Sequence, residues 1–262
     1  MTDSSPKELL EQAESQAQSG NIAAAIALYR SIPGATPQAR KARRTLKSLQ
    51  KNNPGAVMEA DLKQLVALHE AESHKQAMSL ARQLSRSYPE QPLPHNVIGT
   101  VHMARGQFKE AARCFRRALE LAPDFLDARN NLGAASNALE DYEEAITCFS
   151  QVIIGRPRDA TAHANLGKAY RQSDRLEQAV VSYENALSLR PDDESTMLPL
   201  GETLMKLGEK EEALKWYRRT LEKSPDNVQA NYEIGLLLLQ TGNKTEAAQY
   251  MRKALELKFS NR

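Results

Sequence analysis

Residues 128–133 read Ala-Arg-Asn-Asn-Leu-Gly, and residues 162–167 read Ala-His-Ala-Asn-Leu-Gly. The second stretch begins 34 positions after the first, and four columns of residues keep this spacing over five units. The columns hold glycines (Gly99, Gly133, Gly167, Gly201, Gly235), alanines (Ala111, Ala145, Ala179, Ala213, Ala247), bulky side chains (Phe115, Phe149, Tyr183, Tyr217, Met251) and prolines (Pro89, Pro123, Pro157, Pro191, Pro225). A fixed period of this kind predicts one supersecondary unit that is repeated and stacked.

Each unit predicts two short helices, because apolar residues recur at spacings of three, four and seven. In the first regular unit these helices are expected over 93–105 and 108–121. A glycine inside a helix costs about 1 kcal/mol relative to alanine, so the glycine column indicates a close approach of the partner helix. The bulky column is predicted to fill the wedge between the two helices.

Turns and caps are predicted at the same phase in each unit. A left-handed backbone is expected at the end of the first helix, at Gly106, Glu140, Asp174, Gly208 and Gly242. Acidic N-caps are expected for the following first helices, at Asp124, Asp159 and Asp193. Near the N-terminus, Ser5-Pro6-Lys7-Glu8 predicts a capping box with proline at the first helical position.

These residues resemble the tetratricopeptide repeat, whose 34-residue unit carries a Leu-Gly pair, an alanine, an aromatic residue and a proline. The resemblance implies an all-α fold, a right-handed superhelical solenoid of antiparallel helix pairs. Five regular units are expected within 92–262, at 92–125, 126–159, 160–193, 194–227 and 228–261, after a degenerate unit at 58–91. Residues 1–57 are expected to hold one divergent repeat and a basic helix over 38–51, closed by a turn at 52–55.

Composition agrees with a folded helical protein. Of the 262 residues, 41% are hydrophobic, 26% charged and only 5% aromatic, which favours helices over a sheet. No basic stretch leads into an apolar run at the N-terminus, and no apolar run approaches the roughly 20 residues of a membrane-spanning helix. We therefore expect a cytoplasmic protein without a transmembrane segment.

No catalytic or cofactor motif stands out. Phosphate loops, zinc-protease motifs and nucleophile elbows are absent from the sequence, so we expect no enzyme activity and no cofactor. His95, His102 and His163 fall on packing columns, which favours a structural role over metal binding. Cys114 and Cys148 occupy one column of neighbouring units and are expected to be packing residues, too far apart for a disulfide.

The basic helix at 38–51 has six cations and no acid, with Ala39, Ala42, Leu46 and Leu49 on one stripe. Contact with nucleic acid or an anionic membrane is one interpretation. One short helix without interleaved aromatic residues neutralises few phosphates, so a solvated face is favoured and nucleic acid is argued against.

In the resembling family, the first helix of each unit lines a concave binding surface. That implies a peptide-binding groove formed by Asn96, Asp127, Asn130, Asn131, Asn165, Lys168, Arg171, Glu202, Met205, Tyr232 and Leu236. Asn131 and Asn165 share one position of successive units, and their amides could bind a peptide backbone. Alternatively, these two side chains cap turns or face water. Lys168 and Arg171 could pair with an acidic ligand group, or form an ordinary solvated face.

Apolar residues gather at the C-terminal end of this surface, namely Leu198, Tyr232, Leu236 and Leu239. A partner or a second copy is expected to cover them, so self-association through the C-terminal edge stays open. Pro199 is expected to kink its helix locally.

The first functional hypothesis is a non-enzymatic scaffold that binds a peptide segment of a partner protein in its groove. The alternative is the substrate-recognition array of a larger sulfotransferase or glycosyltransferase, because a degenerate unit followed by near-regular units resembles the N-terminal arrays of such bacterial proteins. Fold alone does not decide between them.

Overall fold

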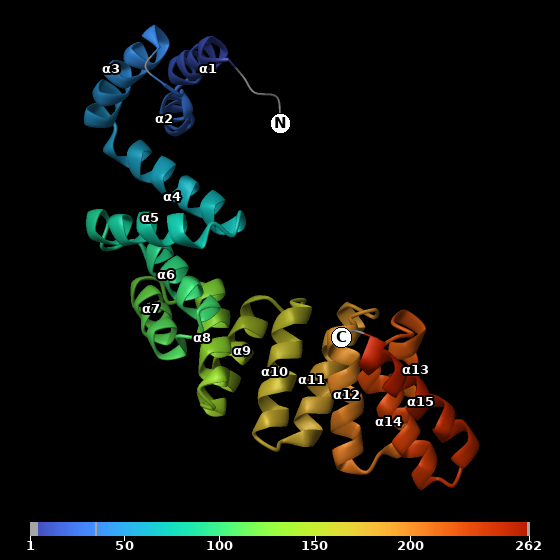
Figure 1. Ribbon diagram of the computed structural model, residues 1–262. Coiled ribbons are helices and arrows are strands. Elements are labelled where there is room, and N and C mark those ends of the chain that lie inside the picture. The colour runs from blue at the N-terminus through green and yellow to red at the C-terminus, as the bar shows by residue number, and fades with distance from the viewer. Residues whose placement is uncertain (1–4, 35, 261–262) are drawn as a thin grey trace. The chain divides into compact units, whose positions relative to one another are not determined.

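The computed structural model describes residues 5–34 and 36–260. Within those residues it holds fifteen α-helices and no strand (Figure 1). The chain divides into two compact units, Met1–Asp124 and Phe125–Arg262. The predicted all-α fold of stacked helix pairs is confirmed.

The first unit contains seven helices. Their bounds are α1 Pro6–Gln18, α2 Ile22–Ser31, α3 Pro37–Asn52, α4 Pro54–Glu70, α5 His74–Ser87, α6 Pro92–Ala104 and α7 Phe108–Leu121. The predicted capping box is confirmed at the start of α1, where the Glu8 amide donates to Ser5 Oγ and the Ser5 amide donates to the Glu8 carboxylate. The helix predicted at 38–51 is α3, and α4 runs across the boundary proposed between residues 57 and 58.

Two apolar clusters form the interior of the first unit. The buried alanines of α3, Ala39 and Ala42, pack with Tyr29, and Leu46 and Leu49 pack against the same cluster. The predicted apolar stripe of α3 therefore faces α1 and α2, which leaves its cations on the outer side. The second cluster joins α4, α5 and α6 around Leu65, Ala77, Ala81, Leu84 and Val97.

Asp61 on α4 is a polar link inside the first unit. Arg30 of α2 donates to one of its carboxylate oxygens at 2.6 Å, and the Tyr88 hydroxyl donates to the other at 3.0 Å. The Asp61 side chain is only 14% exposed. Because a buried carboxylate needs partners of this kind, the pair ties α2 to α4 and to the end of α5.

The second unit contains eight helices. Their bounds are α8 Leu126–Ala138, α9 Tyr142–Gly155, α10 Ala160–Gln172, α11 Leu176–Leu189, α12 Glu194–Leu207, α13 Lys210–Lys223, α14 Val228–Gln240 and α15 Lys244–Ser260. Each even-numbered helix pairs with the one that follows, and consecutive pairs pack side by side (Figure 1). The even-numbered helices are the first helices of the repeats, so one residue type recurs on the same face every 34 positions.

The turn inside each helix pair has one backbone conformation. All five predicted positions have positive φ, with 70° at Gly106, 62° at Glu140 and at Asp174, 84° at Gly208 and 86° at Gly242. Glu72 also has a positive φ, of 52°. Glu72 lies one period before Gly106, so the same turn continues into the degenerate unit at 58–91.

Glu140→Gly should raise the free energy of unfolding by about 0.5–1 kcal/mol. A left-handed conformation costs a residue with a Cβ about 1–2 kcal/mol, part of which glycine returns through its more flexible unfolded chain. Glu184→Gly, at an exposed interior position of α11, is the matched control and should lose about 1 kcal/mol. Urea unfolding followed by circular dichroism measures both; a destabilised Glu140→Gly variant would contradict the expectation.

The N-caps of the first helices also follow the period. Asp159 accepts a hydrogen bond from the Ala162 amide and Asp193 from the Ser195 amide, as predicted. Asn227 does the same for the Ala230 amide. The prediction for Asp124 is wrong: α8 begins at Leu126, its N-cap is Phe125, and no side chain caps it. Asp124 lies one residue before the repeating cap position, which explains why it does not act as the cap.

The glycine column is the contact point between the helices of each pair. A Cβ on Gly99, Gly133, Gly167 or Gly201 would lie less than 3 Å from the ring of the bulky residue in the same unit. At Gly235 the Met251 side chain takes that place. The alanine column is fully buried beside it. The predicted close approach is confirmed, and the side chain that approaches is the bulky column itself.

Several smaller expectations can be compared with the structure. Cys114 and Cys148 are not joined in a disulfide, and burial raises the pKa of the Cys114 thiol. Helix α12 continues from Glu194 to Leu207 through Pro199. No helix in the described part of the chain has the length and hydropathy for a membrane crossing. The same residues hold no group of three or more His, Cys, Asp or Glu placed to bind a metal ion.

Candidate functional site

The predicted groove residues of the second unit lie on its first helices. We call these residues the first-helix face: Asp127, Asn130, Asn131, Asn165, Lys168, Arg171, Glu202, Met205, Tyr232 and Leu236, on α8, α10, α12 and α14. The remaining predicted residue, Asn96, lies on α6 in the first unit and is only 6% exposed. Its burial makes it a poor surface for a peptide, so the interpretation of Asn96 as a groove residue does not fit its environment.

Amide groups join α8 to α10. Asn165 Nδ2 donates to Asn130 Oδ1 at 3.5 Å, and Asn137 Nδ2 donates to Gln172 Oε1 at 2.6 Å. The structure thus brings Asn165 to Asn130, its diagonal neighbour across the two helices. Asn131 and Asn165 are both half-buried. A peptide-gripping ladder of these two amides stays a prediction.

An ion pair joins α10 to α12. Arg171 and Glu202 lie 2.7 Å apart, with side chains 24% and 30% exposed. Partial burial of both side chains makes such a pair less screened by salt than a fully exposed one. Arg171 is therefore already engaged by a carboxylate of this chain, whereas Lys168 is exposed on the same helix. Binding of an acidic ligand group by Lys168 together with Arg171 stays a prediction.

Two tyrosine hydroxyls lie beneath the ion pair. Tyr183 is 2% exposed and Tyr217 is fully buried. The Tyr183 hydroxyl lies near the Arg171 guanidinium, whereas the Tyr217 hydroxyl has no hydrogen-bond partner among the described residues. Burial raises the pKa of Tyr217, and the nearby carboxylates of Glu233 and Glu202 raise it further. Burial also raises the pKa of Tyr183, which the Arg171 guanidinium opposes. A buried hydroxyl without a partner costs about 1–3 kcal/mol.

Sequence reasoning placed Tyr183 and Tyr217 in the bulky packing column and missed their hydroxyls. The signal was present, because the other members of that column are Phe115, Phe149 and Met251. Among these five residues only the two tyrosines carry a hydroxyl group, and both lie in the second unit beneath the Arg171–Glu202 ion pair.

Glu233 is a half-buried carboxylate on α14. Gln229 Nε2 donates to it at 2.5 Å, and no ion pair joins it to a cation in the part of the chain that the structure describes. Burial raises the pKa of Glu233, and the Glu202 carboxylate adds to the rise. The ionised form of Glu233 is therefore less favourable in the folded protein than in the unfolded chain.

Glu233→Gln should make the protein more stable at pH 7. A carboxyl group whose pKa is higher in the folded state destabilises the fold above its unfolded pKa of about 4.3, and this penalty disappears as the pH falls below that value. The variant should have the higher Tm at pH 7, and the difference should shrink towards pH 4. Exposed Glu184→Gln is the control and should leave Tm nearly unchanged at both values; equal Tm for Glu233→Gln and wild type at pH 7 would refute the expectation.

Apolar side chains border the charged groups. Leu198 and Met205 of α12 are half-buried and pack against the core around Leu200 and Ile234. On α14, Tyr232 is 46% exposed and Leu236 is half-buried. The predicted apolar end of the surface is therefore partly exposed, with Leu239 at 48% as its outermost member.

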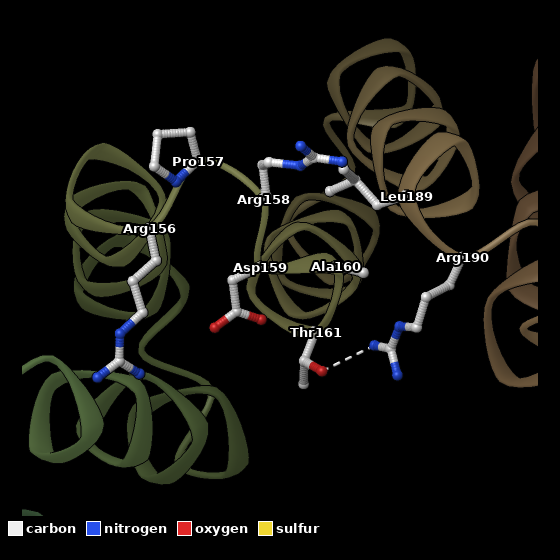
Figure 2. Close-up of a pocket in the computed structure, with 8 residues that line it drawn as sticks. All are labelled: Arg156, Pro157, Arg158, Asp159, Ala160, Thr161, Leu189 and Arg190. Carbon is white, nitrogen blue, oxygen red and sulfur yellow. Dashed lines mark hydrogen bonds between the residues drawn. The ribbon is translucent and has the colours of Figure 1, made fainter.

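Asp127 lies at the edge of the first-helix face, where arginines gather around the start of α10. Arg156 binds Asp127 at 2.5 Å, and Arg190 donates to Thr161 Oγ1 at 2.7 Å. In the hollow at this edge, Arg156 and Arg190 lie on opposite sides of α10, and the Arg158 side chain extends toward Leu189 (Figure 2). Since these cations diverge and Asp159 lies between them, the hollow does not form an anion site.

Family comparison agrees with the repeat structure. Two family models match, one described as tetratricopeptide repeat at residues 96–151 and 198–259, the other described as TPR repeat at 137–174 and 167–208. Together they extend from residue 96 to residue 259, which is more than half of the chain. The chain belongs to the tetratricopeptide repeat family.

Several solved structures have a similar fold. MamA is 25% identical with a TM-score of 0.60, over 63% of this chain and 96% of MamA. YrrB, described as a TPR protein with an unusual peptide-binding site, is 20% identical with a TM-score of 0.59, over 68% of this chain and 91% of its own. PilF of Pseudomonas aeruginosa is 21% identical with a TM-score of 0.64, over 74% of this chain and 88% of PilF. Comparison with curated proteins finds no match.

Proposed function

We propose that this tetratricopeptide repeat protein is a non-enzymatic interaction scaffold, and that the first-helix face binds an extended peptide segment of a partner protein. The observation that carries the proposal is the state of the polar groups on that face. Half-buried amides and carboxylates lie beside exposed apolar side chains and above the Tyr217 hydroxyl, which has no partner among the described residues. A peptide offers backbone donors and acceptors together with apolar side chains, so it complements both the polar and the apolar groups of this face.

YrrB supports this proposal by similarity, because its printed description names a peptide-binding site. Repeat proteins of this kind use the surface lined by successive units for binding. Asn131, Asn165 and Lys168 then contact the peptide backbone and its polar side chains, while Met205, Tyr232 and Leu236 contact apolar ones.

The experiment compares partner capture by three folded proteins. The first is wild type, the second carries Asn131→Ala, Asn165→Ala and Lys168→Ala, and the third carries Val181→Ala, Glu184→Ala and Lys215→Ala on the exposed sides of α11 and α13. Proteins cross-linked in native lysate are identified by mass spectrometry. A partner lost only from the second protein supports the proposal; a partner retained by the second and lost from the third would place binding on the opposite helices.

We also propose that the C-terminal edge takes part in self-association. Leu255 is 56% exposed, whereas its equivalent one period earlier, Leu221, is half-buried and Leu187, one period before that, is 5% exposed. In the earlier units the following helix pair covers this position. Sedimentation equilibrium over a hundredfold range of concentration tests the proposal, which a monomer at every concentration would exclude.

The transferase alternative rests on the sequence resemblance to N-terminal repeat arrays. In this alternative the chain is the substrate-recognition part of a larger enzyme, and that enzyme is located in the cytoplasm. Reading the gene beyond Arg262 tests it, because a catalytic domain of several hundred residues has to follow.

A further inference from the structure

The carboxylates of Glu202 and Glu233 differ in their partners. Glu202 is neutralised by Arg171 at 2.7 Å. Glu233 lies close enough to Glu202 for the two charges to repel, and its hydrogen bond comes from the neutral amide of Gln229 at 2.5 Å. The charge of Glu202 is therefore compensated by Arg171, whereas Glu233 has no ion pair with a cation among the described residues.

Tyr217 brings a second unsatisfied group to the same place. Its ring lies against Gly201, the residue before Glu202, and its side chain is fully buried. Within residues 5–34 and 36–260 its hydroxyl has no hydrogen-bond partner, although the charges of Glu233 and Glu202 both act on it. Because a phenol can donate a hydrogen bond, this hydroxyl can act on a bound ligand through a carboxylate, although its own burial keeps it from direct contact.

Apolar side chains flank these polar groups. Leu236 lies one turn along α14 from Glu233, and Met205 lies one turn along α12 from Glu202, so each is on the same helix face as its carboxylate. The exposed cation Lys168 occupies the Glu202 position one period earlier, on α10. The α12–α14 end of the first-helix face therefore combines apolar walls with a negative charge, and the α10 end is positive.

We propose that Glu233, together with the Tyr217 hydroxyl and the apolar side chains of Met205 and Leu236, forms a subsite for a lysine or arginine side chain of the bound peptide. The inference rests on the proposed function and adds the chemistry of the ligand. Lysine and arginine carry an apolar stem with a cationic head, which matches an apolar border around a carboxylate. The head neutralises Glu233 and supplies the charged donors that Glu233 lacks.

A display selection tests the subsite without knowledge of the partner. A library of random 12-residue peptides is selected against wild type, Glu233→Gln and Glu184→Gln, the last being an exposed carboxylate on α11. Wild type and Glu184→Gln should both enrich Lys or Arg at one position, and Glu233→Gln should not.

Binding of one selected peptide then gives the magnitude. Replacing its basic residue by norleucine, which keeps the stem and removes the charge, should weaken binding to wild type at least tenfold by fluorescence polarisation. The same replacement should change binding to Glu233→Gln less than twofold. Tyr217→Phe should reduce the preference for the basic peptide severalfold, and its circular dichroism spectrum verifies that it is folded.

The outcomes separate the two proposals. Peptides that bind the first-helix face without any basic preference would overturn the subsite and leave the peptide groove standing. Both the groove and the subsite would be overturned if no selected peptide lost binding to the variant that carries Asn131→Ala, Asn165→Ala and Lys168→Ala. Equal loss of the basic preference in Glu184→Gln would also overturn the subsite, because the effect would then reflect net charge.

Discussion

Tyr217→Ala should lower the free energy of unfolding by about 3–5 kcal/mol. The side chain is fully buried in the cluster that contains Leu200 and Ile234, and its ring fills the space above Gly201. Truncation removes that buried apolar surface and leaves a cavity between α12 and α13. Thermal and urea unfolding, followed by circular dichroism, give the loss directly.

Two further tyrosine variants separate packing from polarity. Tyr217→Phe keeps the ring and removes a hydroxyl that has no partner, so its stability should equal or exceed that of wild type. Tyr232→Ala truncates a tyrosine that is 46% exposed and should cost little. A Tyr217→Phe variant as unstable as Tyr217→Ala would show that the hydroxyl, rather than the ring, stabilises the unit.

Gly201→Ala should destabilise the protein by about 1–2 kcal/mol, although alanine is the better helix former. The added Cβ would lie 2.5 Å from Cε1 and 2.8 Å from Cδ1 of Tyr217. Overpacking of a buried site costs about 1–3 kcal/mol, and the gain in helix propensity offsets up to about 1. The measurement is the midpoint of urea unfolding.

Two comparisons test the cause of that loss. Gly55→Ala, in α4, adds a Cβ that meets nothing within 4 Å, so it should be neutral or stabilising. In a Tyr217→Ala background the cavity has room for the methyl group, and Gly201→Ala should then cost nothing. An unchanged cost in that background would mean that the ring is not what the methyl group meets.

The fold was predictable because its determinants are local and repeated. A glycine, an alanine and an aromatic residue at one phase define the packing of a helix pair, and five copies leave little ambiguity. The turn at Glu140 and Asp174 was predictable for the same reason, since glycine stands at that phase in three other units. Phe125 shows the limit of this reasoning, because the chemically attractive cap, Asp124, lies one residue outside the repeating position.

The site was less predictable, because it depends on contacts between units. Arg171 and Met205 occupy equivalent positions of successive units, so the repeat predicts that they lie side by side. The Arg171 side chain instead reaches diagonally to Glu202. Asn165 likewise reaches Asn130, and Asp127 binds Arg156 from the loop before α10. Long flexible side chains choose partners across the helix face, and a column of equivalent positions does not reveal those choices. The tyrosine hydroxyls were overlooked because ring size alone explained their column.

The turn of positive φ that recurs from Glu72 to Gly242 has a consequence for how such a gene can change in length. Because every turn and every ring-on-glycine contact falls at one phase, removing or duplicating one whole period joins surfaces that already match. A loss of any other number of residues would shift the glycine of one helix away from the ring of its neighbour. The array can therefore evolve by whole units, and each gain or loss moves the residues of the binding face by one helix pair without redesigning the interior.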